Sequence, residues 1–373
     1  MNGLTELDVR KANACLECGR CTGVCPVSET HGFSPRRIIS RLVAGGEPDA
    51  ADDDSIWSCL TCRLCEQVCP AAIPYADFNR KLRVSYRKNK EPEPCVHGGV
   101  FVEIMRLMQR PGLNQKRLDW VTDDLKIKRE KGDVLFFTGC SPYFAAYFGN
   151  ETAEQLTASL RGAVRLLNAV GIEPVLLENE RCCGHDLLLR GDTEGFAIMR
   201  KMMVKQVEDT GAHTVVFTCP ECLSTFKSDH APMKPSLMHL SQFLAPKAEK
   251  LSLKPNGGAV TFQDPCRLGR YCDIYDEPRT LLSRVPDMDI REMEHSRERA
   301  ICCGSTAWTG CNAGTREVQI KRLSEADATG ADTLITACPK CQIHLRCARE
   351  GNEQPVGPEP ADIWAYLASR LET

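Results

Sequence analysis

The chain has 373 residues, and eighteen of its 22 cysteines fall into regular patterns that limit what it can fold into. Two runs, CLECGRCTGVCP and CLTCRLCEQVCP, share the spacing C-x2-C-x2-C-x3-C-P. In bacterial ferredoxins this spacing binds a pair of [4Fe–4S] clusters, and the fourth cysteine of each run serves the other cluster. Zinc knuckles are the alternative, but they rarely use two identical four-cysteine runs. The spacing predicts one cubane cluster on Cys15, Cys18, Cys21 and Cys69, and a second on Cys59, Cys62, Cys65 and Cys25.

The composition indicates that these thiols serve metal or redox chemistry rather than disulfide bonds. Hydrophobic residues make up 42% of the chain and charged residues 26%, as in ordinary globular proteins that fold without disulfides. The first residues contain no apolar segment of a secretory signal, and no apolar run approaches the length of a membrane span. A net charge of −3 argues against nucleic acid as the main partner. We therefore expect a cytoplasmic protein without a membrane span of its own.

The remaining two thirds of the chain contain a long internal repeat. Each copy has a single cysteine, then a Cys-Cys-Gly motif, then a C-P-x-C motif, and the two copies lie about 120 residues apart. A repeat of this length indicates two copies of a whole domain. The cysteines of the first copy are Cys140, Cys182, Cys183, Cys219 and Cys222, and those of the second are Cys266, Cys302, Cys303, Cys338 and Cys341.

Short apolar runs precede these cysteines and read as buried strands. Four runs end on a cysteine, and a further strand is expected in EPVLLENERCCG, just before the first Cys-Cys pair. Amphipathic helices separate the runs, and this alternation predicts parallel sheets. Ligands bind at the carboxyl ends of parallel strands, so the five cysteines of each copy should converge there as a metal site. The four runs are Asp133–Cys140, His213–Cys219, Ala259–Cys266 and Asp332–Cys338.

The Cys-Cys-Gly repeats resemble the cysteine-rich CCG domains in the B-type subunit of heterodisulfide reductase. The N-terminal part, with CLECGRCTGVCP, SPRRIISRL and IWSCLTCRLCEQVCP, is similar to the C-type subunit of the same enzyme. The whole chain resembles a natural C/B fusion, which is the D-type subunit. This resemblance implies a non-cubane [4Fe–4S] cluster on the five cysteines of each copy. Zinc or an ordinary cubane in one copy stays open, because five soft ligands could serve several metals.

The chain is thus predicted to be an α+β multidomain protein. Residues 1–90 form an α-helical ferredoxin-like domain with two cubane clusters, and residues 91–131 form a linker with helices. Two repeated α/β CCG domains with parallel sheets follow over residues 132–252 and 253–373.

Candidate catalytic residues lie at the Cys-Cys pairs. His185 directly follows the first Cys-Cys-Gly motif and could donate a proton to a departing thiolate, or be a satisfied polar loop residue, since the second copy has Ser305 there. The candidates are Cys182, Cys183, Cys302, Cys303 and His185. Arg181, Arg267, Arg270 and Lys340 flank cluster cysteines and could bind an anionic substrate or neutralise cluster charge. The remaining cysteines, Cys95, Cys272, Cys311 and Cys347, are expected to be small buried hydrophobes.

Reduction of a disulfide needs two electrons, and each iron–sulfur cluster delivers one. Two complete CCG motifs therefore suit this reaction. The sequence has no G-x-G-x-x-G or Walker A motif after a strand, so electrons should arrive from another subunit. We expect an iron–sulfur oxidoreductase subunit of a heterodisulfide-reductase-like complex, fed by a flavoprotein and acting on a small-molecule disulfide.

Two other functions stay open. The first is the iron–sulfur subunit of a glycolate, lactate or glycerol-3-phosphate type dehydrogenase, which passes electrons to a quinone-linked acceptor. The second is a non-catalytic relay that works with other iron–sulfur or dehydrogenase subunits, including one that holds it peripherally at a membrane. In the dehydrogenase subunits one CCG motif is often incomplete, whereas both are complete here, which favours the reductase.

Overall fold

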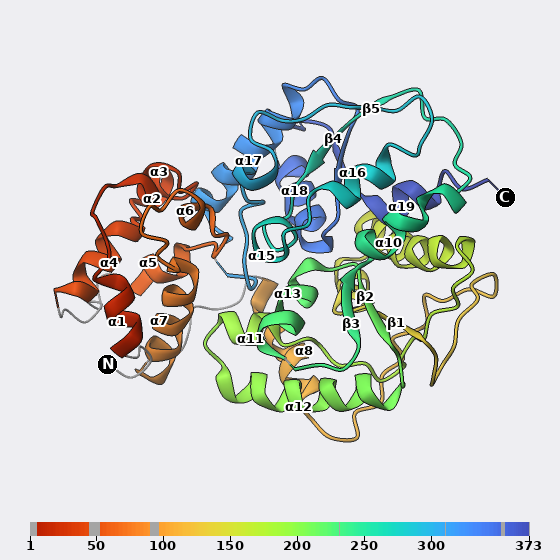
Figure 1. Ribbon diagram of the computed structural model, residues 1–373, viewed down its shortest axis with the longest axis horizontal. Helices are drawn as coiled ribbons and strands as arrows, with labels where there is room; N and C mark the ends of the chain where they lie inside the picture. Colours follow the sequence, from red (N-terminus) through yellow and green to blue (C-terminus); the bar gives the residue numbers. More distant parts are fainter. Residues whose placement is uncertain are drawn as a thin grey trace.

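The computed structural model describes residues 6–44, 53–89, 97–230, 232–309, 311–351 and 355–372. A helical N-terminal domain lies beside two α/β units (Figure 1). The predicted α+β multidomain fold is therefore confirmed.

The N-terminal domain is built from short helices joined by the cysteine loops. Helix α4 begins at Pro35, because Ser34 Oγ accepts a hydrogen bond from the Arg37 backbone N–H and Pro35 occupies the first turn. The apolar faces of these helices join the second repeat in one core that includes Trp57, Phe78 and Val318. The helices are α1 (Glu6–Ala12), α2 (Arg20–Gly23), α3 (Ser28–His31), α4 (Pro35–Val43), α5 (Asp53–Ser58), α6 (Leu64–Gln67) and α7 (Tyr75–Asn89).

Each repeat contains a parallel sheet, with three strands in the first repeat and four in the second. The first has the order β1-β2-β3, with β1 (Val134–Phe137), β2 (Thr214–Phe217) and β3 (Ser236–His239). The second has the order β5-β4-β6-β7, with β4 (Ala259–Gln263), β5 (Asp289–Ile290), β6 (Thr333–Thr336) and β7 (Glu359–Asp362). The four strands predicted from apolar runs are confirmed as β1, β2, β4 and β6.

Two features of the sheets differ from the sequence prediction. The strand expected before the first Cys-Cys pair is reduced to Val175, which forms isolated parallel bridges with Leu135 and Lys128. Strands β3, β5 and β7 were not predicted, because SLMH, DI and EPAD carry no continuous apolar run. All three lie at a sheet edge, where pairing on one side relaxes the demand for apolar residues.

Helices connect the strands of both repeats. The segment before the first sheet holds η2 (His97–Gly99) and α8 (Val100–Met108). The first repeat continues with α9 (Ser141–Phe148), α10 (Asn150–Ala169), α11 (His185–Leu189), α12 (Thr193–Asp209), α13 (Pro220–Asp229), α14 (Leu240–Leu244) and η3 (Ala245–Lys250). The second has α15 (Gly269–Cys272), α16 (Asp276–Leu282), η4 (Arg297–Arg299), α17 (Ala313–Asp327), α18 (Pro339–Glu350) and α19 (Ile363–Ala368).

The two repeats pack tightly together, because a helix of each repeat contacts elements of the other. Helix α10 of the first repeat packs on α19 and β7 of the second, and α16 of the second packs on α14 of the first (Figure 1). The approach of α10 to α19 is so close that a Cβ on Gly162 would lie 2.4 Å from the Trp364 carbonyl oxygen. Ser159 Oγ also donates a hydrogen bond to Asp362 Oδ1 at 2.6 Å. The repeats therefore share one core and hold a fixed mutual orientation.

Among the helices of the described residues, none is both long enough and apolar enough to cross a membrane.

Candidate metal centre

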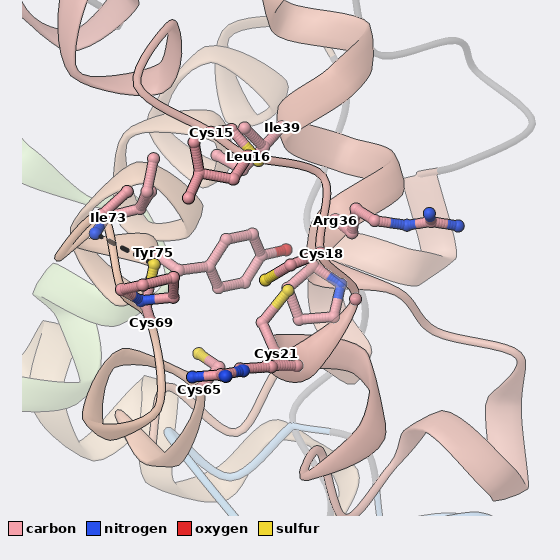
Figure 2. Close-up of a pocket in the computed structure, with 15 residues that line it drawn as sticks. Cys15, Leu16, Cys18, Cys21, Arg36, Ile39, Cys65, Cys69, Ile73 and Tyr75 are labelled. Carbon is pink, nitrogen blue, oxygen red and sulfur yellow. Dashed lines mark hydrogen bonds between the residues drawn. The ribbon is translucent and has the colours of Figure 1, made fainter.

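Two cavities in the N-terminal domain collect the eight ferredoxin-type cysteines. In the first, Cys65 joins the four thiols of one predicted set, and the other lining residues include Leu16, Ile39 and Ile73 (Figure 2). Soft thiolates in an apolar cavity are the donor chemistry that an iron–sulfur cluster needs. The first cavity is lined by Cys15, Cys18, Cys21 and Cys69, and the second by Cys25, Cys59, Cys62 and Cys65.

Backbone amides also point at these sulfurs. The Thr61 N–H donates to Cys59 Sγ at 3.3 Å, and the Ile73 N–H donates to Cys69 Sγ at 3.4 Å. Such hydrogen bonds stabilise thiolates and tune the potential of a bound cluster. The structure thus brings together both cysteine sets, in the crossed arrangement that the spacing predicts.

The five cysteines of each CCG repeat form one connected group. Two sulfur–sulfur distances, Cys140 to Cys182 and Cys303 to Cys341, are 3.2 Å. Hydrogen-bond contacts between thiols connect the other members of each group in the same order. These orders are Cys140, Cys182, Cys183, Cys222, Cys219 in the first repeat and Cys266, Cys302, Cys303, Cys341, Cys338 in the second. Five converging thiols in each repeat suit a polynuclear metal site better than a packed core.

The fold places these thiols at positive helix ends. Cys140, Cys219 and Cys338 are the N-cap residues of α9, α13 and α18, and a proline follows in the first turn of each helix. The partial positive charge at a helix N-terminus favours thiolates over thiols. Because β1 and β2 of the first sheet and β6 of the second end just before these helices, each sheet delivers its cysteines at the carboxyl ends of its strands, as predicted.

Steric constraints explain why a glycine follows the paired cysteines in each Cys-Cys-Gly motif. Gly184 and Gly304 have φ values of +79° and +78°, which L side chains rarely adopt. A Cβ would lie 2.8 Å from the Phe196 ring in the first repeat and 2.9 Å from the Thr315 carbonyl oxygen in the second. The glycine therefore lets the chain turn directly after the paired cysteines.

The cysteine groups also touch one another across domain boundaries. Cys219 and Cys338, which hold the same motif position in the two repeats, are in hydrogen-bond contact. Cys62 of the N-terminal domain is in hydrogen-bond contact with Cys302 of the second repeat. An unbroken series of thiol contacts therefore runs from Cys62 through both repeats to Cys140.

A buried ion cluster lies where the repeats meet. Lys340 Nζ is 2.6 Å from Asp186 Oδ1 and 2.7 Å from Glu221 Oε2. Burial disfavours the charged ammonium, but the two carboxylates outweigh it and hold the pKa of Lys340 well above its usual value. Burial raises the pKa of Glu221 to about 8, because two carboxyl groups share one ammonium away from water. Glu221 and Lys340 are the variable residues of the two C-P-x-C motifs. Equivalent positions of the two repeats therefore carry opposite charges, and their ion pair joins the repeats.

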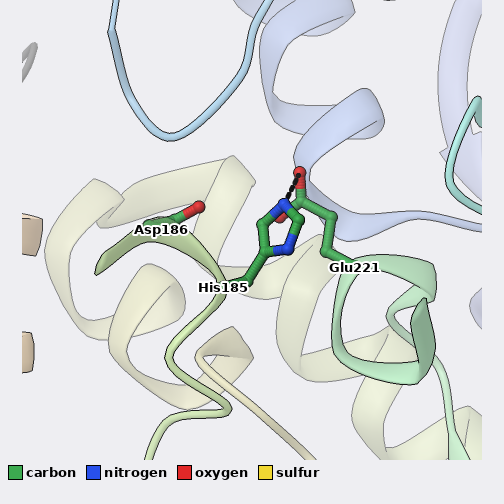
Figure 3. Close-up of side chains that lie close together, drawn as sticks. All are labelled: His185, Asp186 and Glu221. Atoms are coloured by element: carbon green, nitrogen blue, oxygen red, sulfur yellow. Dashed lines mark ion pairs between the residues drawn. The ribbon is translucent and has the colours of Figure 1, made fainter. Parts of the chain in front are cut away.

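His185 belongs to the same interface (Figure 3). Its Nδ1 lies 2.8 Å from Thr225 Oγ1, and its Nε2 lies 3.6 Å from Glu221 Oε1. Burial lowers the pKa of His185 well below its usual value, and the nearby Arg267 and Lys340 cations add to this effect. The imidazole is therefore neutral and hydrogen-bonded, and its role as a proton donor stays a prediction.

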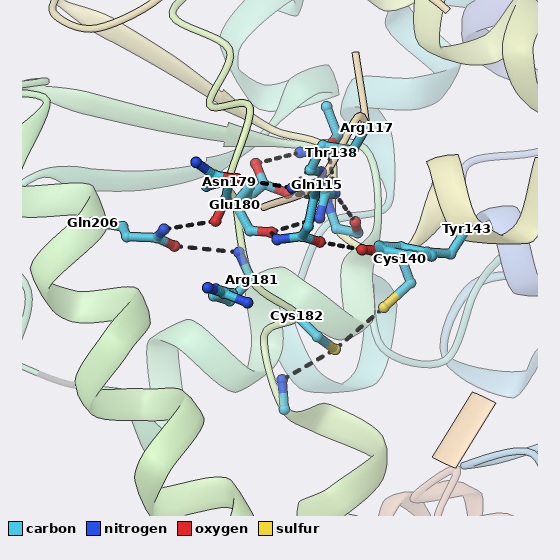
Figure 4. A network of polar contacts seen from close by, with 12 residues as sticks. Gln115, Arg117, Thr138, Cys140, Tyr143, Asn179, Glu180, Arg181, Cys182 and Gln206 are labelled. Atoms are coloured by element: carbon cyan, nitrogen blue, oxygen red, sulfur yellow. Dashed lines mark hydrogen bonds and ion pairs between the residues drawn. The ribbon is translucent and has the colours of Figure 1, made fainter. Parts of the chain in front are cut away.

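A second buried pair, which the sequence did not reveal, holds the Cys140 loop (Figure 4). Arg117 Nη2 is 3.0 Å from Glu180 Oε1 and also donates hydrogen bonds to Thr138 Oγ1 and the Gly139 carbonyl. Glu180 accepts from the backbone N–H groups of Thr138 and Gly139. Burial raises the pKa of Glu180 to about 7, and Arg117 opposes this rise. Arg117 lies in the segment that was expected to be a linker, which therefore forms part of the site.

Comparison with known proteins places the chain in a family. Residues 134–227 and 260–346 match the cysteine-rich CCG domain family, and residues 11–73 match the 4Fe-4S dicluster domain family. The D-type subunit of the dihydromethanophenazine:CoB–CoM heterodisulfide reductase of Methanosarcina barkeri is 30% identical, over 99% of this chain and 96% of that protein. The chain belongs to the family of heterodisulfide reductase D-type subunits. The resemblance carried by the sequence motifs is therefore confirmed.

Two further relatives show the range of names attached to this architecture. The D-type subunit of the Methanosarcina mazei enzyme is 29% identical, over 93% of this chain and 91% of that protein. The B-type subunit of a fumarate reductase (CoM/CoB) from Methanothermobacter marburgensis is 25% identical, over 92% of this chain and 69% of that protein. The matched regions of this member of the D-type family contain all eighteen motif cysteines.

The basic residues that flank the cysteines of this D-type family member hold the domains together. Arg267 donates hydrogen bonds to the carbonyl and hydroxyl oxygens of Thr61 at 2.9 and 2.7 Å. Arg270 Nε donates to the Cys62 carbonyl at 2.6 Å. Arg181 Nη2 donates to the Leu113 carbonyl at 3.1 Å. These contacts, together with the ion cluster at Lys340, favour a structural role over binding of an anionic substrate.

Three of the four cysteines outside the motifs, Cys272, Cys311 and Cys347, fall within the described residues. Cys311 and Cys347 are exposed, which contradicts the expectation that they are buried hydrophobes. Cys272 is partly buried, and burial raises its pKa to about 11. Cys95 lies outside the described residues.

Proposed function

We propose that this protein is the iron–sulfur catalytic subunit of a heterodisulfide-reductase-like complex, which reduces a disulfide-type substrate with electrons from a flavoprotein partner. The observation that carries the proposal is the pairing of two complete five-cysteine groups through Cys219 and Cys338, with the second group in contact with Cys62. The names of its relatives support the reductase assignment, since two are subunits of CoB–CoM heterodisulfide reductases and one is a subunit of a fumarate reductase (CoM/CoB).

The donor sets fit four clusters. The eight ferredoxin-type cysteines would hold two cubanes, and each CCG group would hold a further [4Fe–4S] cluster, which the family resemblance makes non-cubane. When bound, such clusters supply one-electron carriers, and two of them side by side match a two-electron reduction. The catalytic assignment rests on the paired cysteines Cys182, Cys183, Cys302 and Cys303, which are all buried.

Basic side chains hold the N-terminal domain and the two repeats in a fixed arrangement. Arg267 and Arg270 attach the N-terminal domain to the second repeat, while Lys340 ties the two repeats together. The exposed Cys18, at the edge of the cavity that lies farther from the repeats, offers the flavoprotein an approach to the first cysteine set. We expect domain boundaries close to residues 90, 131 and 252, as the sequence predicted.

The function is tested with the anaerobically purified protein after chemical reduction. Addition of a small-molecule disulfide should reoxidise the protein and release two thiols per disulfide, because each repeat supplies one of the two electrons. Thiols are counted with a chromogenic reagent after removal of the protein.

A parallel reaction with a soluble quinone separates the two main functions. If the quinone reoxidises the protein while the disulfide leaves it reduced, the chain relays electrons from a dehydrogenase to quinone. If neither reacts, the chain is a non-catalytic relay.

A further inference from the structure

Two cysteines outside the motifs lie where the start of α17 meets the last turns of α18. Cys311 directly precedes Asn312, which is the N-cap residue of α17. Cys347 lies on α18, and the two helices pack side by side (Figure 1). Both cysteines are free thiols and both are exposed. The second repeat therefore presents two thiols to solvent, outside its five-cysteine group.

Arg316 connects the surroundings of the two cysteines. Its backbone N–H donates a hydrogen bond to the Asn312 carbonyl at 3.0 Å, and its Nη1 donates to the Cys347 carbonyl, also at 3.0 Å. Partial burial raises the pKa of the Cys311 thiol, the nearby Cys347 adds to this rise, and Arg316 opposes it. Charges near the surface act on one another only over about 10 Å. The two thiols and the guanidinium group therefore share one small site.

We propose that Cys311 and Cys347 form a redox-active thiol pair, which a small-molecule disulfide converts into an intramolecular disulfide bond. In the first step the Cys347 thiolate attacks one sulfur of the small molecule, forms a mixed disulfide and releases one thiolate. In the second step the Cys311 thiolate attacks the Cys347 sulfur and releases the other half of the molecule as a second thiolate. The two protein thiols thus lose two protons and two electrons, and the small molecule gains them as two thiols.

The positions of the two cysteines suit the two steps. Exposure of Cys347 lets the small molecule reach its sulfur from solvent. The second step takes place within one chain, which raises the effective concentration of the attacking thiol. This proximity compensates for the raised pKa of Cys311, which keeps most of that thiol protonated at neutral pH.

The disulfide bond would fasten the second five-cysteine group from outside. Cys311 follows the paired cysteines Cys302 and Cys303 in the chain, whereas α18 begins after Cys338 and contains Cys341. A bond between Cys311 and α18 would therefore tie the two halves of the group together. Under the proposed function the substrate is itself a disulfide, so the pair would respond to the amount of substrate. This regulatory role rests on the proposed function, whereas the thiol exchange does not.

The proposal is tested on the anaerobic holoprotein with its clusters oxidised, so that they supply no electrons, by incubation with hydroxyethyl disulfide. The reaction is stopped with a maleimide in acid, released thiols are counted, and peptides are mapped by mass spectrometry. The original chain should release two thiols and contain a link between Cys311 and Cys347. Cys311→Ser and Cys347→Ser should each release one thiol and keep one hydroxyethylthio group on the remaining cysteine. Cys272→Ser removes a partly buried cysteine outside the motifs, so this control should keep the link.

Three outcomes would overturn this assignment. The hydroxyethylthio group stays on the original chain because the two thiols cannot reach each other, neither cysteine reacts, or the link forms to a motif cysteine such as Cys303. The iron content should stay unchanged during the reaction, since the motif cysteines take no part in it. Because the clusters are oxidised from the start, a failure of cluster-driven disulfide reduction would leave this test unaffected.

Discussion

Replacement of Lys340 by methionine should lower the free energy of unfolding by about 3–5 kcal/mol. The variant keeps a side chain of similar length but leaves Asp186 and Glu221 buried without their shared cation. Breaking a buried ion pair costs this much because the remaining charge cannot be solvated. The effect should be seen as a melting temperature lower by several degrees, measured by circular dichroism under anaerobic conditions.

Lys205→Met provides the matched control. Lys205 pairs with Asp209 at 2.9 Å, but the two side chains are 75% and 61% exposed, and such surface pairs contribute at most about 1 kcal/mol. Equal melting temperatures for the two variants would contradict the view that the ion cluster holds the repeats together. Iron content of both variants shows whether any loss of stability comes with loss of metal.

Replacement of Cys303 by serine should abolish disulfide reduction and remove about four irons, because one cluster loses a ligand while the other three keep theirs. Cys303 lies 3.2 Å from Cys341 and is in contact with Cys302, so it connects the two halves of the second group. The electron paramagnetic resonance signals of the cubanes should persist, since the eight ferredoxin-type cysteines are unchanged.

Cys347→Ser is the control for this experiment, because Cys347 is exposed and outside every motif. It should keep the full iron content and full activity. Disulfide reduction that continues in Cys303→Ser would exclude the paired CCG groups as the reaction site, even if iron were lost.

Much of the site could be predicted from the sequence, because its metal-binding cysteines lie in short motifs and directly after predicted strands. Ferredoxin spacing places three thiols on one loop, and the exchange of Cys25 and Cys69 between sets follows from that spacing. The apolar runs before Cys140, Cys219 and Cys338 predict strands, and within each sheet parallel strands bring their carboxyl ends to one edge. For these reasons the cysteine groups found in the structure are the predicted ones.

The contacts between repeats could not be predicted, since they depend on how two folded units pack. One signal was present but unused: the variable residues of the two C-P-x-C motifs, Glu221 and Lys340, carry opposite charges. The Arg117–Glu180 pair had no such signal, because Arg117 lies far from any motif. The packing of α10 and α16 against helices of the other repeat likewise depends on tertiary structure. Local sequence patterns therefore could not predict it.

The metal content of the anaerobically purified protein tests the central claim most directly. Eighteen cysteines in four groups should hold about sixteen irons and as many acid-labile sulfides, without zinc. This is measured by plasma mass spectrometry and sulfide analysis against protein concentration. About eight irons together with one or two zinc ions would contradict the account, because the CCG groups would then be zinc sites.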